Sequence, residues 1–130
     1  MAERSLIGER DFTPDAASVS SARRFVLSLL DAAPELVDSV QLAVSELATN
    51  AVLHARSSFR VRVSRQGSRL RVAVHDSSPA AAAKKDYGPT AVTGRGLTIV
   101  EQLTDDWGVT PDGSGKWVWF EVTDVPQEVR

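Results

Sequence analysis

The sequence predicts an α+β domain, a two-layer sandwich whose helices cover one face of a mixed, mostly antiparallel sheet. Apolar residues recur at helical spacing in two long segments, residues 18–32 and 34–54. They alternate with polar residues in four short segments, which pair as two hairpins: 59–64 with 70–74, and 107–110 with 116–122. One-sided helices must bury their apolar stripe, and one face of such a sheet is where they do so.

The first half of the chain supplies an edge strand and two helices. Residues 5–12 are short and mixed in polarity, and the turn residues at 13–15 end this strand. The helix over residues 18–32 carries its apolar residues on one side: Ala22, Phe25, Val26, Leu29 and Leu30. Pro34 suits the first turn of the second helix, whose stripe continues to His54.

The second half contains a long loop between the two hairpins. Turn residues separate the strands of the first hairpin at 66–68 and those of the second at 111–115. Residues 77–93 show no period and are longer than most connections, which is typical of a functional lid. A short helix over 94–103 follows the lid. The expected order of elements is therefore β, α, α, β, β, lid, α, β, β.

Composition excludes several classes of function. The 130 residues suit one domain, 1–130, and the absence of cysteine excludes disulfides, thiolate zinc sites and thiol nucleophiles. Two histidines make a multi-histidine metal centre improbable, and 15 basic against 17 acidic residues give a net charge of -2, which does not favour nucleic acid or anionic lipid. The charged start and the lack of a long apolar run predict a cytoplasmic protein with no membrane span.

Glu46 and Asn50 are four residues apart on the second helix, so they lie on one side of it, between Leu42 and Leu53 on one flank and Ala43 on the other. The sequence leaves two interpretations open. They hydrogen-bond to each other or to solvent at the edge of the apolar stripe, or Asn50 supplies an oxygen to Mg²⁺ while Glu46 activates a hydroxyl or water.

Asp76 follows directly after an alternating strand, where the chain leaves the sheet. An ionised carboxylate only accepts hydrogen bonds, so it suits the amino group of adenine better than the carbonyl of guanine. The alternative is an aspartate that caps the turn at 76–79.

Gly94-Arg95-Gly96 stands before an apolar helix, where backbone N–H groups and the helix dipole favour phosphate. A single GxG is weak evidence, and Ile99 replaces the third glycine of a dinucleotide fingerprint. The similar run at 113–116 precedes a strand and is interpreted as a hairpin turn. His54 and His75 lack the setting of a catalytic triad. The tryptophans are interpreted as core or sheet-face aromatics: Trp107, Trp117 and Trp119.

In this order, the segments SELATNAVLHA, VAVHD, GRGLTIVEQLTDDWGV and KWVWFEV resemble the GHKL or Bergerat-fold ATPases, a group that includes histidine-kinase catalytic domains and gyrase B. The similarity covers the chain from the first helix to Val122. The compact length and the pairing of GRGL with WG resemble most the bacterial anti-sigma factor serine kinases. The ordered set is specific, although each piece alone is not.

The resemblance implies a Bergerat ATP-binding fold and a role for each matching residue. Glu46 falls on the general base, Asn50 on the magnesium ligand and Asp76 on the adenine-binding aspartate. The phosphate-side motif falls on four consecutive residues: Gly94, Arg95, Gly96 and Leu97. The implied cofactors are ATP and Mg²⁺. The implied partners are a sigma factor and an anti-anti-sigma protein with a STAS domain, phosphorylated on serine, and the implied assembly is a homodimer.

Two departures from the family pattern bear on function. Ser78 and Ala80 stand where the family often has glycines, and Ala55 stands where a glycine is frequent after His54. A protein serine kinase is the first hypothesis, because Glu46 and Asn50 are both present. The alternative is a nucleotide-dependent protein-binding module without phosphoryl transfer, which the altered glycines favour. A histidine-kinase fragment is a third hypothesis, but the sequence has no room for a phosphoacceptor helix pair beside this domain. The least specific hypothesis is an α+β domain that binds no ligand.

Overall fold

The computed structural model describes residues 3–55, 57–78 and 94–124. Five strands form one sheet in the order β1-β2-β3-β5-β4, and each neighbouring pair is antiparallel. The strands are β1 Ser5–Phe12, β2 Phe59–Gln66, β3 Arg69–Asp76, β4 Asp106–Asp112 and β5 Gly115–Thr123. The predicted two-layer α+β fold is confirmed, and the parallel pairing that a mixed sheet would contain does not occur among these strands.

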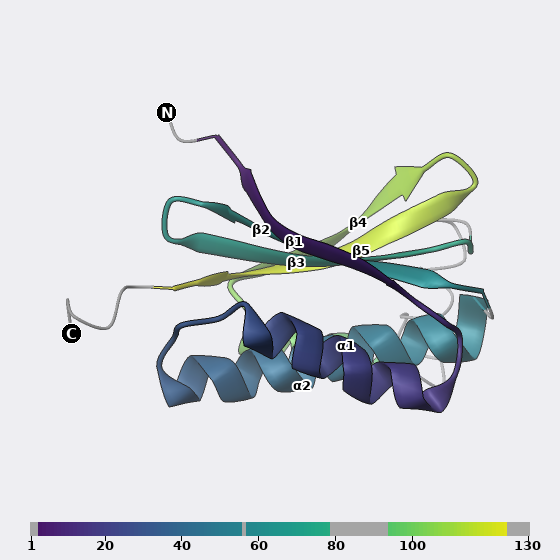
Figure 1. Ribbon diagram of the computed structural model, residues 1–130, viewed down its shortest axis with the longest axis horizontal. Helices are drawn as coiled ribbons and strands as arrows, with labels where there is room; N and C mark the ends of the chain where they lie inside the picture. The colour runs from purple at the N-terminus through teal and green to yellow at the C-terminus, as the bar shows by residue number, and fades with distance from the viewer. Residues whose placement is uncertain (1–2, 56, 79–93, 125–130) are drawn as a thin grey trace.

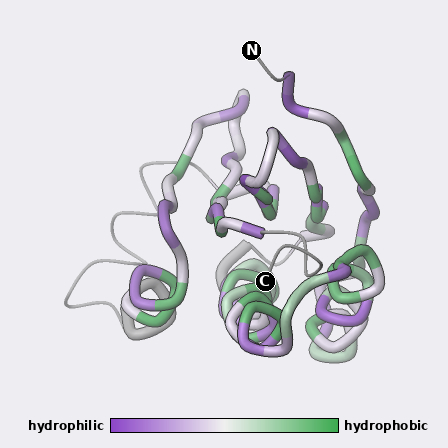
Figure 2. The backbone as a smooth tube through the Cα atoms, turned by 90° about the vertical axis from the view of Figure 1, so that its left-hand side faces the viewer, coloured by the Kyte–Doolittle hydropathy of each residue, from purple (hydrophilic) through white to green (hydrophobic). Residues whose placement is uncertain are grey.

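The helices lie together beneath one face of the sheet, as Figure 1 shows for α1 and α2. They are α1 Ala16–Ser28, α2 Pro34–Asn50 and α4 Gly94–Leu103, with a π-helical turn, η1 Ala51–Ala55, at the end of α2. Figure 2, turned by 90°, separates the strands above from the helices below. Strand β1 lies at one edge of the sheet, as expected.

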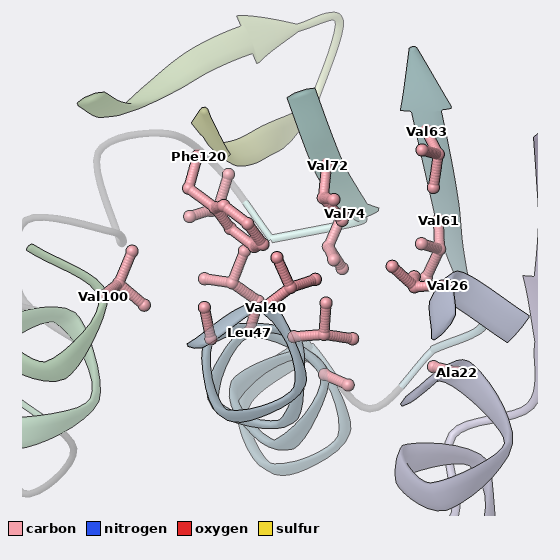
Figure 3. Close-up of a cluster of buried hydrophobic side chains, with 14 of the residues drawn as sticks. Ala22, Val26, Val40, Leu47, Val61, Val63, Val72, Val74, Val100 and Phe120 are labelled. Atoms are coloured by element: carbon pink, nitrogen blue, oxygen red, sulfur yellow. The ribbon is translucent and has the colours of Figure 1, made fainter. Parts of the chain in front are cut away.

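The core fills the space between these layers. Alternate residues of β2, β3 and β5 face the helices, and along most of each row they are apolar and buried: Phe59, Val61, Val63, Leu70, Val72, Val74, Val118, Phe120 and Val122. In Figure 3, Ala22 of α1, Leu47 of α2 and Val100 of α4 meet them from three neighbouring helices. Burial of this continuous apolar layer is the main force that holds the helices against the sheet.

Helix α1 is displaced from its predicted range of 18–32. It begins earlier because Asp15 caps it: the Asp15 carboxylate accepts a hydrogen bond from the Ser18 N–H at 3.1 Å. It also ends earlier, with Leu29 as its C-cap, because the residues before Pro34 leave the helical conformation. The residue before a proline is pushed out of the helical region, and Ala33 is extended with ψ 148°.

Two tight turns close the hairpins and fix their register. Gly67 and Gly113 have φ of 61° and 62°, a conformation that glycine adopts without strain. The strands run closer to these turns than expected, so the second hairpin closes at Gly113 and Ser114. The prediction of a hairpin turn for residues 113–116 is confirmed for its first two residues, while Gly115 and Lys116 belong to β5.

The other face of the sheet carries arginine and tryptophan side chains. The Arg62 guanidinium lies 4.3 Å from the ring centroid of Trp117, and that of Arg71 lies 3.9 Å from the ring centroid of Trp119. The prediction of sheet-face aromatics is confirmed for these two, while Trp107 packs against the core. Among the described residues, no helix is long and apolar enough to cross a membrane.

Candidate functional site

The end of α2, the end of β3 and helix α4 belong to elements that touch one another. Helix α2 contacts both α4 and β3, and η1 contacts β3. The Ser57 hydroxyl, after η1, lies 2.6 Å from that of Ser77, after β3, within hydrogen-bond distance. The residues singled out in the sequence therefore lie on neighbouring elements.

Asn50 is the last residue of α2 and is buried, with 3% of its surface exposed. Its Nδ2 atom is buried and has no hydrogen-bond partner among the residues that the structure describes. A buried amide without a partner costs free energy, so such a group is uncommon unless a ligand completes it. The π-helical turn that follows Asn50 is a feature often found at functional sites.

Glu46 lies one turn before Asn50 and is half-buried. Among the described residues we find no hydrogen bond or ion pair to its carboxylate. Leu42 and Leu53 on its flank are 45% and 53% exposed, whereas Ala43 on the other flank is fully buried. Glu46 and Asn50 thus border the core as predicted. Among the described residues they form no hydrogen bond to each other, so of that alternative only bonding to solvent remains open.

Asp76 ends β3 and is buried, with 3% of its surface exposed. Its Oδ1 atom accepts hydrogen bonds from the backbone N–H of Ser78 at 2.9 Å and from the Ser78 hydroxyl at 2.7 Å. The turn-capping alternative therefore describes part of the observed geometry. Capping does not occupy the whole carboxylate, since Oδ2 takes no bond from Ser78.

The remaining partner of Asp76 is a lysine that sequence reasoning missed. The Lys116 ammonium lies 2.7 Å from Oδ1 and 2.9 Å from Oδ2 of Asp76, and it also donates to the Ser78 hydroxyl. Lys116 is 1% exposed, and a lysine is almost never buried this completely unless it is paired, as it is here with Asp76. The two residues lie directly opposite each other in the pairing of β3 with β5.

The alternation of the strands contained the signal for this pair. Lys116 is in phase with Val118 and Phe120 along β5, and Asp76 is in phase with Val72 and Val74 along β3. Both ionisable residues therefore stand at the end of a core-facing row. Opposite charges at the ends of two paired rows predict a buried ion pair, once the register is known.

Gly115 allows the two strands to approach at this point. A Cβ atom at this position would collide with the carbonyl oxygen of Asp76 and would lie 3.1 Å from Cε1 of His75. His75 itself lies 3.3 Å from Asp112 through Nε2 and packs its ring against Trp117. Among the described residues no serine hydroxyl is bonded to His75, so its contact with Asp112 is not part of a catalytic triad.

The phosphate-side motif forms the first turn of α4 in its backbone, which confirms the predicted helix over 94–103. For Gly94, Arg95, Gly96 and Leu97 the structure describes the backbone alone, and the same holds for His54. The lid prediction, residues 77–93, falls outside the described residues from 79 onwards.

The residues present fit a magnesium ion that takes most of its ligands from phosphate and water oxygens and few from the protein. The described residues contain no group of three or more histidine, cysteine, aspartate or glutamate side chains that could hold a metal. Mg²⁺ commonly takes one or two protein oxygens and completes its octahedron with phosphates and water. The two ends of an asparagine amide are exchanged by a half-turn, so the unpartnered end of Asn50 can present its oxygen to a cation.

Comparison with known proteins defines the class. Residues 12–122 match the family described as "Histidine kinase-like ATPase domain", and the chain belongs to this family. Membership implies that the chain binds ATP, and it bears out the predicted GHKL or Bergerat resemblance.

A solved structure agrees on the fold. The RsbU and RsbW domains of Rv1364c from Mycobacterium tuberculosis superpose with a TM-score of 0.68 at 18% identity, over 92% of this chain. The match covers 33% of that chain, so this protein spans about a third of its length. No curated protein matches the sequence.

Proposed function

We propose that this protein is an ATP-binding regulator of the anti-sigma factor type, which phosphorylates a serine of a STAS-domain antagonist and sequesters a sigma factor. The observation that carries the proposal is the buried, unpartnered amide of Asn50 at the end of α2. A family that uses ATP explains why such a group is kept, because an oxygen of the bound phosphates would accept the hydrogen bond that Nδ2 leaves unmade.

Each site residue has a proposed task. Asp76 accepts a hydrogen bond from the exocyclic amino group of adenine through Oδ2, the oxygen to which Ser78 does not donate. Asn50 holds Mg²⁺, which would neutralise the charge on the phosphates. The backbone N–H groups at the start of α4, in residues Gly94, Arg95, Gly96 and Leu97, face the phosphate oxygens.

Glu46 is the proposed general base. It takes the proton of the antagonist's serine hydroxyl while the serine oxygen bonds to the γ-phosphorus of ATP, and ADP leaves with the electron pair of the broken bond. Its place one helical turn from Asn50 puts the base and the metal ligand on one side of α2. Catalysis of this type depends mainly on positioning, so the rigid helix is a suitable support.

Incubation with γ-labelled ATP, Mg²⁺ and candidate STAS-domain proteins tests the kinase. Glu46→Ala is expected to lower transfer about 100-fold or more, in line with the usual contribution of a general base. Glu35→Ala is a matched control, because Glu35 is an exposed glutamate at the other end of the same helix. Equal transfer by all three proteins would contradict the role of Glu46.

Calorimetry tests the nucleotide site separately from transfer. We expect ATP and ADP to bind wild-type protein, Asp76→Ala to weaken both, and Asn50→Ala to reduce the dependence on Mg²⁺. The absence of any nucleotide binding by the wild-type protein would refute the proposal at its base.

A second candidate function is a protein-binding module that responds to nucleotide without transferring phosphate. The observation that favours it is Glu46, whose carboxylate has no hydrogen bond or ion pair among the described residues. Catalytic bases are usually oriented by a further group. Nucleotide-dependent binding of a sigma factor without labelling of any STAS protein would support this module.

We also propose that the protein forms a homodimer, as the family resemblance implies. Light scattering of the same samples tests this assembly.

A further inference from the structure

The buried pair formed by Asp76 and Lys116 changes what the proposed nucleotide site can recognise. Asp76 is the only acidic partner of the Lys116 ammonium among the described residues, and their side chains are 4% and 2% exposed. A charge that is this deeply buried is kept only if it is paired and hydrogen-bonded. A base that reaches the carboxylate must therefore also meet the ammonium.

The hydrogen-bonding capacity of the pair is only partly used. Among the described residues, Oδ1 of Asp76 takes three donors, two from Ser78 and one from Lys116, whereas Oδ2 takes Lys116 alone. Oδ2 therefore keeps room for one further donor. Lys116 directs two of its contacts to the same carboxylate, so one of them can be exchanged for a base acceptor without leaving Asp76 unpaired.

We infer that Lys116 is a specificity-determining residue of this site, which relaxes the preference for adenine that Asp76 alone would impose. This inference rests on the proposed function. Adenine offers an amino donor beside the N1 acceptor, and guanine offers the N1–H donor beside the O6 acceptor. A carboxylate placed where it meets the adenine amino group would repel the O6 of guanine at the same position. When an ammonium lies beside the carboxylate, the carboxylate can accept from the donor of either base and the ammonium can donate to its acceptor, with the two positions exchanged between adenine and guanine.

The first test uses wild-type protein with base analogues, so it does not depend on the folding of a variant. ATP and inosine triphosphate are expected to bind within about tenfold of each other, since each offers one donor beside one acceptor. The triphosphate of purine riboside lacks both the amino group and the N1–H, and is expected to bind about tenfold more weakly. Binding of inosine triphosphate 100-fold weaker than ATP would overturn the inference.

The second test substitutes Lys116. Lys116→Met keeps most of the length of the side chain and removes its charge and donors. The ratio of ATP to GTP affinity is expected to rise about tenfold or more. Lys116→Arg, which keeps the charge and the donors, is expected to leave the ratio close to that of the wild type.

The outcomes separate this inference from the proposed function. If no nucleotide binds to the wild-type protein, the proposed function fails. If ATP binds but Lys116→Met leaves the ATP to GTP ratio unchanged, only the inference fails. An equal gain for both nucleotides would mean that Lys116 merely obstructs the carboxylate, and this also overturns the assignment. Ser78→Ala is the matched control, because it removes one hydrogen bond to Asp76 and one from Lys116 without removing either charge. Its ratio is expected to stay unchanged.

Discussion

Gly115 is the residue at which the candidate site depends most directly on the absence of a side chain. Gly115→Ala would bring a methyl group against the carbonyl oxygen of Asp76, a backbone atom that can move only with its strand. We expect a loss of about 1–3 kcal/mol in the free energy of unfolding, as for other overpacked positions, together with weaker nucleotide binding. Chemical denaturation measures the first effect.

The control for this change lies next to it in the chain. Ser114 is exposed in the same turn, so Ser114→Ala is expected to change the free energy of unfolding by less than about 0.5 kcal/mol. An equally large loss in both variants would mean that the turn is sensitive to any change, and that the close approach at Asp76 is not the cause.

Asn50 should show opposite effects on stability and on ligand binding. An apolar residue of similar size removes a buried polar atom that has no partner, so Asn50→Leu is expected to raise the free energy of unfolding of the ligand-free protein by about 1 kcal/mol. The same change removes the proposed magnesium ligand. Thermal unfolding without ligand and with Mg²⁺ and ATP measures both, and a stabilising effect of Mg²⁺ and ATP that survives in the variant would contradict the metal role.

At the scale of secondary-structure elements, β5 links the core to the site. The side of β5 that faces the helices carries Phe120 near its centre and Lys116 near its end, so one strand positions a core residue and a residue of the candidate site. Phe120 is fully buried, and Phe120→Ala is expected to cost about 3–5 kcal/mol, through lost burial and the cavity left behind. Denaturant unfolding measures this cost, and a value below about 1 kcal/mol would show that the layer between sheet and helices is less tightly packed than the structure indicates.

Periodicity predicted the elements well because it reports which face of each element is buried. The alternation in β2, β3 and β5 and the stripe of α2 follow directly from contact with one core. The ends of α1 were less predictable, because they depend on a local hydrogen bond to Asp15 and on the geometry before Pro34. The ion pair of Asp76 with Lys116 required the register of two strands that are 40 residues apart in the chain.

The candidate site was predictable only as a set of residue types at suitable spacing. Asn50 and Asp76 are buried at the ends of their elements, as a ligand site requires, but the roles assigned to them and to Glu46 come from the family resemblance and remain predictions. Chemical function depends on which atoms are left without partners. Among the described residues, the amide nitrogen of Asn50 has no partner and Oδ2 of Asp76 is bonded to Lys116 alone. Both are properties of the folded chain, and no spacing rule gives them.

At the scale of the whole molecule, Glu121 joins distant parts of the chain on the face of the sheet away from the helices. Its carboxylate binds Arg4, which precedes β1, and two arginines of β3, Arg69 and Arg71. Burial raises the pKa of Glu121, but the hydrogen bonds from Arg69 and Arg71 and the nearby positive charges outweigh it, so the pKa lies below its ordinary value of 4.5. The ionised form is therefore favoured by folding.

This shift predicts how the stability of the protein changes in acid. A carboxyl group whose pKa is lowered by folding stabilises the protein above its unfolded pKa, and this contribution is lost as pH falls through the folded pKa. The free energy of unfolding is therefore expected to decline below about pH 4.5. Asp11 and Asp15 add to this decline, because hydrogen bonds from Arg60 and Thr13 respectively lower the pKa of each.

Glu121→Gln isolates the part of that decline that belongs to the arginine cluster. The variant is expected to be less stable than the wild type at pH 7, because three arginines lose their shared carboxylate, and the difference should shrink as pH falls below 4.5. Denaturant unfolding at a series of pH values from 7 to about 3 measures both curves. Parallel curves would show that Glu121 titrates alike in the folded and unfolded chains, and that the arginines of this face are held by packing on Trp119 and its neighbours instead of by charge.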